Sequence, residues 1–154
     1  MFLWIAFIIC TSVIVYSGMR LSMYGDIIAE KTGLGRTWIG VVLMASVTSL
    51  PEVVVSFAAV RMDAVDLAIG NLFGSNIFNI FILALDDIFF IKGPLLSSAN
   101  QSNIISALSA IAMTAIAIIG LTYRAEKKKL FLAWDSIGIA LVYVVNLMLL
   151  YMLK

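Results

Sequence analysis

One stretch of the chain gathers oxygen ligands around a carboxylate within a long apolar segment. Thr48, Ser49 and Glu52 are spaced by three and four residues, which places two hydroxyls and one carboxylate on the same face of a helix. Pro51 has no backbone N–H, so the carbonyl of Val47, four residues earlier, loses its helical donor and the helix is expected to bend there. Carboxylate, hydroxyl and carbonyl oxygens are hard ligands, which suit Ca²⁺ or Na⁺ better than a soft metal.

A second polar cluster follows about twenty residues later. Gly70 and Gly74 form a G-x-x-x-G pattern, which lets a neighbouring helix backbone approach closely. Ser75 and Asn79 are four residues apart and share a helical face, where they add a hydroxyl and an amide carbonyl. Helix packing is expected to bring this face opposite Glu52. The two clusters together predict an ion site at mid-membrane depth on a discontinuous helix.

Each of these residues also has an ordinary structural interpretation. Proline and glycine are common in transmembrane helices, and a lone Ser or Thr usually bonds the carbonyl of the preceding turn. Glu52 is the exception, because a carboxylate near the centre of an apolar span costs roughly 2.5 to 3.5 kcal/mol, so a functional role is expected for it. Of the other carboxylates, Asp86, Asp87 and Asp135 are expected near the headgroups, and Asp63 and Asp66 are expected in the first turn of the third span.

The elements that must position these residues are membrane helices. The chain has 154 residues, of which 63% are hydrophobic and 12% charged, so lipid is its expected solvent. A helical span needs about 20 apolar residues to cross a bilayer. The apolar runs predict an all-α integral membrane protein with five transmembrane helices, at about 2–22, 36–60, 65–91, 102–123 and 130–153.

The composition argues against several other classes of protein. The chain has one cysteine, Cys10, and no histidine, so neither a disulfide framework nor a transition-metal cluster is indicated. It has no phosphate-binding loop and no nucleophile with a base in reach by spacing, so we expect neither an enzyme nor a bound prosthetic group. A net charge of +1 without a basic stripe argues against nucleic acid as a partner. The first apolar run lacks a basic n-region and an A-x-A site, and is expected to be retained as a span.

The two clusters in this order and spacing resemble the alpha repeat of the sodium/calcium exchanger family, within the calcium/cation antiporters. The close resemblance covers about residues 25–85, and the five-helix layout extends it over 1–154 as a single membrane region. It implies half of a ten-helix transporter made of two inverted halves. It also implies a set of ion ligands in this half, namely Thr48, Ser49, Glu52, Ser75 and Asn79, with the backbone carbonyl at Val47 as an addition.

Two positions depart from the family pattern. The family usually has Gly where Val47 stands, immediately before the Thr-Ser pair, so the backbone is bulkier where an ion approaches. The family often has an acidic residue in one half at the position of Asn79. Two identical halves would therefore offer only two carboxylates, a formal charge that balances one Ca²⁺ and is equally compatible with other cations or protons.

A complete site by this resemblance needs a second half, either an antiparallel copy of the chain or a separate five-helix chain. The tally of basic residues is even, so it fixes no orientation and agrees with insertion both ways. With loops taken alternately, one side receives Arg61, Arg124, Lys127, Lys128 and Lys129 and the other Arg20, Lys31, Arg36, Lys92 and Lys154.

Two functions follow from these observations. The first is a secondary antiporter half in the cell membrane, which exchanges Ca²⁺ or a similar cation for Na⁺ or H⁺ after pairing. The second is a non-transporting regulatory or assembly subunit, in which Val47 blocks the ion and the glycine pattern serves assembly. A small-multidrug-type exporter is a more distant alternative, since a single carboxylate would not explain the hydroxyl and amide residues around it.

Overall fold

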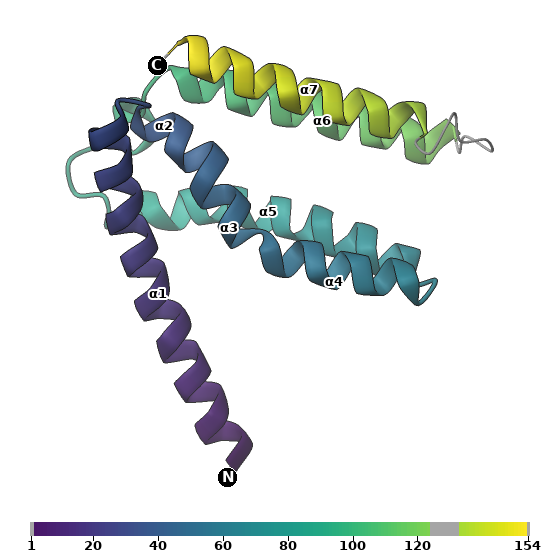
Figure 1. Cartoon of the computed structure of the whole chain (residues 1–154), viewed down its shortest axis with the longest axis horizontal. Helices are drawn as coiled ribbons and strands as arrows, with labels where there is room; N and C mark the ends of the chain where they lie inside the picture. Colours follow the sequence, from purple (N-terminus) through teal and green to yellow (C-terminus); the bar gives the residue numbers. More distant parts are fainter. Residues whose placement is uncertain (1, 124–132, 154) are drawn as a thin grey trace. The chain divides into compact units, whose positions relative to one another are not determined.

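The computed structural model describes residues 2–123 and 133–153, and within these ranges the chain is helical and has no strand (Figure 1). The basic residues Arg124, Lys127, Lys128, Lys129 and Lys154 lie outside the described residues. The chain forms two compact units, which we describe separately. The hairpin unit comprises residues 45–100, and the flanking unit comprises the described residues on either side, 2–44 and 101–153.

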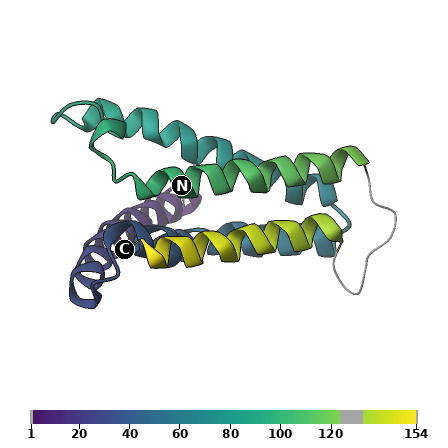
Figure 2. The same ribbon diagram turned by 90° about the horizontal axis from the view of Figure 1, so that it is seen from above.

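The hairpin unit is built on two antiparallel helices, α4 (Leu50–Arg61) and α5 (Val65–Phe89), which lie side by side (Figures 1 and 2). A short turn joins them, closed by a hydrogen bond from the Ala64 N–H to the Ala59 carbonyl at 2.9 Å. Ala59 and Ala68 are both buried, which lets the two backbones approach closely, as small residues do between membrane helices.

One acidic residue of this unit differs from expectation. Asp66 lies in the first turn of α5 as predicted, but Asp63 lies in the preceding turn with a φ of 58°, so its prediction as a helix residue was wrong. The tight reversal requires one residue in the left-handed region, which Asp tolerates better than most residues. The Oδ1 of Asp87 accepts a hydrogen bond from the Leu95 N–H at 2.7 Å, which links the end of α5 to the loop that follows it.

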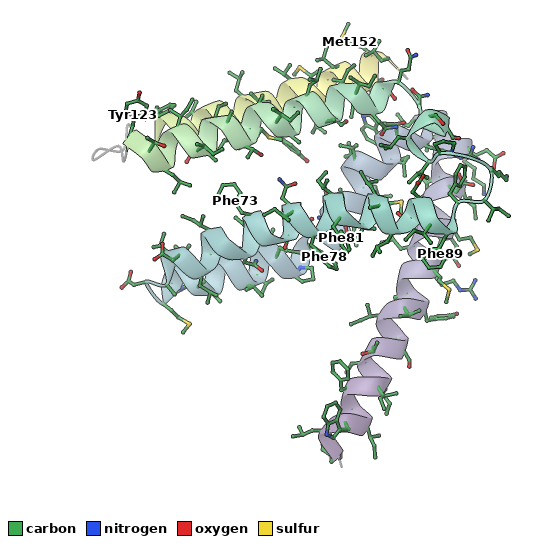
Figure 3. The ribbon with its side chains drawn as sticks, turned by 180° about the vertical axis from the view of Figure 1, so that it is seen from behind. Phe73, Phe78, Phe81, Phe89, Tyr123 and Met152 are labelled. Atoms are coloured by element: carbon green, nitrogen blue, oxygen red, sulfur yellow. The ribbon has the colours of Figure 1, made fainter. Side chains whose placement is uncertain are left out.

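Apolar side chains cover much of the rest of α5. Figure 3 labels Phe73, Phe78, Phe81 and Phe89 along this helix. Phe78, Phe81 and Phe89 are exposed, and the rings of Phe78 and Phe81 lie 6.2 Å apart between centroids. A short 3₁₀ turn, η2 (Leu96–Ser98), lies in the loop that follows α5.

The flanking unit contains a second antiparallel pair, α6 (Ser102–Tyr123) and α7 (Trp134–Met152), drawn green and yellow in Figure 2. Glycines permit close contacts in it. A Cβ at Gly138 would meet Ile116 at the ordinary distance of 3.5 Å, whereas a Cβ at Gly120 would overlap Oδ2 of Asp135. Asp135 thus lies in the first turn of α7, packed against the backbone of α6.

The same unit holds α1 (Phe2–Thr32), α2 (Arg36–Ile39) and the π-helix η1 (Gly40–Met44). Gly33 and Gly35 have positive φ angles of 67° and 80°, which reverse the chain after α1 at little steric cost. Arg36 then forms an ion pair with Asp26, through Nε to Oδ1 and through Nη2 to Oδ2 at 3.3 Å. Both side chains are exposed, so this pair orients the turn and adds little stability.

The predicted spans correspond to observed helical segments and differ from them in some bounds. The span at 102–123 coincides with α6, and that at 65–91 ends two residues late. The predicted end of the first span at 22 was wrong, because α1 continues to Thr32; hydropathy marks the apolar part of a helix, and its polar last turns continue until Gly33. The last span was predicted from 130, and α7 begins at Trp134, with 130–132 outside the described residues.

The predicted second span, 36–60, is divided into several pieces. It runs through α2, η1, α3 (Ala45–Thr48) and α4, with a bend of 46° at the break between Thr48 and Leu50. Within the described residues, four helices are long and apolar enough to cross a bilayer, and this bent segment makes a fifth if it is one span. The protein is therefore an all-α integral membrane protein.

Candidate ion-binding site

Glu52 lies just beyond the break in the second span. Ser49 separates α3 from α4, and Pro51 occupies the first turn of α4, where its missing N–H interrupts no helical bond of that helix. The break therefore falls two residues before the proline. Glu52 follows in the same first turn, where the N-terminal backbone N–H groups of α4 favour a negative charge.

The carboxylate of Glu52 has an unusual environment. The residue as a whole is half-buried, but its Oε2 is shielded from solvent and has no hydrogen-bond partner among the described residues. A buried carboxylate oxygen without a partner is costly, so such atoms generally mark a site that a proton, a cation or another polar group completes. In the part of the chain that the structure describes, two other side-chain polar atoms are buried without a partner, Ser106 Oγ and Asn146 Oδ1, and both belong to the flanking unit.

Asn71 of α5 holds the turn of α4 that carries Glu52. Its Nδ2 donates to the hydroxyl oxygen of Ser56 at 3.1 Å and lies 3.4 Å from the backbone carbonyl oxygen of Glu52. Both contacts are partly buried and connect residues 15 and 19 positions apart in the sequence. Both are polar contacts between α4 and α5, and they mark which turns of the two helices lie beside each other.

From this pair of contacts, the helical repeat indicates which predicted ligands on α4 and α5 lie at the same height along the two helices. Because the helices are antiparallel, each turn along α5 away from the hairpin loop moves one turn back along α4. Starting from Asn71 beside Ser56, the next turn of α5 carries Ser75, which is level with Glu52. One turn further along α5 lies Asn79, and one turn back from Glu52 lies Thr48, which is on the other side of the break.

Ser75 and Asn79 differ in how far they are shielded from solvent. Ser75 is half-buried, whereas Asn79 is exposed, and neither side chain hydrogen-bonds to Glu52 in the part of the chain that the structure describes. Asn79 lies opposite the bent segment, so the hairpin alone does not set its distance from Thr48.

The predicted ligands before α4 differ from Glu52 in their hydrogen bonds and exposure. The Thr48 hydroxyl donates to the carbonyl of Ala45 at 3.2 Å, which is the ordinary back-bonding of a helical threonine. Ser49 occupies the position before α4, yet its side chain makes no capping hydrogen bond. Val47 is exposed, and Pro51 offers no N–H to its carbonyl. The Ser49 hydroxyl is therefore not used as a helix cap, and the Val47 carbonyl lacks its usual helical donor.

The glycine pair of the second cluster is open. A Cβ built at Gly70 or at Gly74 would meet nothing within 4 Å among the described residues, so the close helix contact predicted for this pattern is not made within them. The small residues that do pack the hairpin are Ala59 and Ala68.

Sequence reasoning missed Asn71 and Ser56. Their spacing in the sequence could have identified both. Ser56 is four residues after Glu52 and Asn71 is four residues before Ser75, so each extends a polar helix face by one turn. The described residues contain no group of three His, Cys, Asp or Glu side chains that could hold a metal ion. Any cation here would be bound by one carboxylate with neutral oxygens, a donor set suited to Na⁺ or Ca²⁺.

Known proteins resemble this chain over most of its length. The family described as sodium/calcium exchanger protein matches residues 2–152. The sodium/calcium exchanger MaX1 of Methanosarcina acetivorans is 38% identical over 124 residues, an alignment that covers 80% of this chain and 33% of that protein.

Two further relatives match shorter stretches. The inner membrane protein YrbG of Escherichia coli is 41% identical over 70 residues, covering 46% of this chain and 22% of that protein. The antiporter-named protein CaxA of Alkalimonas amylolytica is 42% identical over 62 residues, covering 40% of this chain and 19% of its own length. The chain thus aligns with a third or less of the length of these relatives.

No solved structure matches the chain well enough to count as similar. The family match covers nearly every residue from the first helix to the last. The chain belongs to the sodium/calcium exchanger family.

Proposed function

We propose that this chain is half of a secondary cation antiporter, which exchanges Ca²⁺ or a similar cation for Na⁺ or H⁺ after it pairs with a second half. The observation that carries the proposal is the Oε2 of Glu52, which is buried and has no hydrogen-bond partner among the described residues, in a hairpin where Asn71 contacts the same turn of α4. Membership of the exchanger family and the name of CaxA support antiport.

The charge of the site suits exchange between unlike cations. One Glu52 from each of two halves gives a formal charge of −2, which one Ca²⁺, two Na⁺ or two protons would neutralise. The neutral oxygens of Thr48, Ser49, Ser75 and Asn79, with the Val47 carbonyl, would complete the coordination of a dehydrated ion. Residues 1–154 would form one membrane region, with its spans in the cell membrane.

The second half is proposed to be an antiparallel copy of the chain, with a separate five-helix chain as the alternative. The even tally of Lys and Arg favours the copy, because a chain without a charge bias can insert in both orientations. The open faces of Gly70 and Gly74 are where another helix could approach.

A non-transporting membrane subunit is the second candidate function. Two observations favour it: Val47 stands where the family usually has Gly, and the Thr48 hydroxyl is bonded within its own helix. In this case Glu52 would serve assembly, and its removal would weaken pairing instead of ion binding.

The test is Ca²⁺ and Na⁺ flux in liposomes that contain the purified chain, alone and with a candidate second half. Glu52→Gln should abolish flux, while Glu30→Gln, which removes an exposed carboxylate of α1, should leave it unchanged. Flux that is absent in every combination, together with a Glu52→Gln chain that no longer pairs, would favour the non-transporting subunit.

Orientation distinguishes the two kinds of second half. A reporter fused after Lys154 should be found on both faces of the membrane if antiparallel copies pair. A reporter on one face only, unchanged when charges are moved between Arg20 and Arg61, would exclude the antiparallel copy and leave a separate chain as the partner.

A further inference from the structure

We propose that Asn71 is the positioning residue of the ion site, and that through Glu52 and Ser56 it sets which cation the site prefers. The inference rests on the proposed function, because it assigns a role within the same site. It concerns a side chain that is level with Ser56 and one turn from the predicted ligand Ser75, and that is not itself among the predicted ligands.

Asn71 contacts both ends of one turn of α4. In an α-helix the carbonyl of Glu52 faces the N–H of Ser56, four residues later, so these two groups mark the ends of a single turn. The Nδ2 of Asn71 reaches the Glu52 carbonyl at 3.4 Å and the Ser56 hydroxyl at 3.1 Å. One amide nitrogen therefore touches both ends of the turn on which the carboxylate is carried.

The contact requires the chemistry of an amide. A side-chain NH₂ has two N–H donors on one nitrogen, one for the carbonyl and one for the hydroxyl. An ionised Asp at position 71 has no donor and would face the Glu52 carbonyl with like partial charge, and a Ser has one donor. Gln keeps both donors but is longer by one methylene, which moves them out of place.

Fixing this turn fixes the carboxylate relative to Ser75. Ser75 lies one turn along α5 from Asn71, at the level of Glu52, so rotation of α4 about its axis would change the gap between the carboxylate and the Ser75 hydroxyl. Ca²⁺ takes six to eight oxygens at about 2.3 to 2.6 Å, whereas a proton needs only one oxygen. Loosening the turn should therefore weaken Ca²⁺ binding more than protonation.

The prediction is a change in preference and not only a loss of activity. In the assembled protein in liposomes, Asn71→Ala should lower the apparent affinity for Ca²⁺ about three- to tenfold relative to the affinity for protons, as expected for the loss of one or two partly buried hydrogen bonds. The measurement is Ca²⁺ uptake across a pH series, from which both affinities are obtained. Gln101→Ala, which removes an exposed amide outside the hairpin, is the control.

Ser56→Ala provides a second, milder variant. It removes one of the two acceptors and should shift the same ratio in the same direction by less, and the double variant with Asn71→Ala should shift it by less than the sum of the two. If Asn71→Ala does not accumulate in the membrane, the ratio of Ca²⁺ to proton affinity in Ser56→Ala alone tests the positioning role.

The outcomes separate this inference from the proposed function. Full transport by Glu52→Gln would remove the proposed function and this inference with it. If Glu52→Gln is inactive but Asn71→Ala and Ser56→Ala keep the wild-type ratio of Ca²⁺ to proton affinity, the function stands and the positioning role is wrong. A uniform loss of protein in the membrane with an unchanged ratio would also overturn it, because that is what a merely structural contact predicts.

Discussion

The amide nitrogen of Asn71 and the hydroxyl oxygen of Ser56 lie 3.1 Å apart across α4 and α5. With α4 and α5 antiparallel, the helical repeat counted from this contact puts Ser75 at the level of Glu52, although the rest of α4, the turn and the first part of α5 lie between them in the sequence. The candidate ligands therefore fall on two segments, Glu52 with Ser75 and Asn79 within the paired helices α4 and α5, and Thr48 with Ser49 before α4 at the break.

The charge and the length of the side chain at position 52 should affect Ca²⁺ binding to different degrees. Glu52→Gln keeps the shape and removes the charge, so Ca²⁺ affinity should fall about a hundredfold or more, since losing one partner of a desolvated charge pair costs about 3 kcal/mol or more. Glu52→Asp keeps the charge on a shorter side chain and should retain part of the activity. Equilibrium binding of Ca²⁺ to both variants checks this, and equal affinity of Glu52→Gln and wild type would contradict it.

Position 79 should control preference among cations. Asn79→Ala removes a neutral carbonyl dipole and should weaken binding less than Glu52→Gln does, while Asn79→Asp adds a charge and should shift preference toward divalent cations. A competition series of Ca²⁺, Na⁺ and protons on both variants is the measurement. Because Asn79 is exposed in the hairpin, neither change should affect folding. The same selectivity in all three proteins would remove Asn79 from the ligand set.

The face of α5 that carries Gly70 and Gly74 should contact the second half of the transporter. Gly74→Leu has free space within the described chain, so the hairpin should fold as before, but the larger side chain should weaken association with a second half about tenfold or more. Gly18→Leu is the matched control, since Gly18 is also helical and has nothing within 4 Å of a built Cβ. Cross-linking in membranes would measure association, and equal losses for both variants would mean that Gly74 has no special part in pairing.

Two glycines of the α6 and α7 pair should respond oppositely to the same substitution. Gly120→Ala places a Cβ against Asp135, whose own Cβ would lie 3.1 Å away, and overpacking of this kind costs about 1 to 3 kcal/mol. Gly138→Ala meets Ile116 at 3.5 Å and should be neutral or stabilising, because Ala favours a helix over Gly by up to about 1 kcal/mol. Thermal unfolding in detergent compares the two, and a stable Gly120→Ala would show that Asp135 moves aside freely.

Much of the architecture could be predicted because apolar runs in a membrane protein correspond directly to helices. The span at 102–123 and the resemblance to the exchanger family are confirmed. A bend near Pro51 is confirmed as well, although it falls at Ser49, because the proline is accommodated in the first turn of the new helix. Hydropathy could not locate the end of α1, since the helix continues through polar residues to Thr32.

The arrangement of the site was harder to predict than its members. Spacing along one helix shows which side chains share a face, but not how far one helix is shifted along another. That shift depends on the length of the hairpin turn, including the positive φ of Asp63, and on the contact between Asn71 and Ser56. The roles of Thr48, Ser49, Glu52, Ser75, Asn79 and Val47 as ligands stay predictions. The π-helix at Gly40–Met44 had no signal that we can identify in the sequence.

The side chains buried within the described helices are few and small. Apart from Ile39, Leu150 and Asn146, they are alanines, among them Ala59 and Ala68 where α4 meets α5. Contacts of this size contribute little free energy, so each helix owes its existence to the backbone hydrogen bonds that lipid enforces, and the pairing of helices is a separate and weaker step. On moving the protein from lipid to a harsh detergent, the helical circular dichroism should therefore persist after the distance between labels on α4 and α5 has already increased.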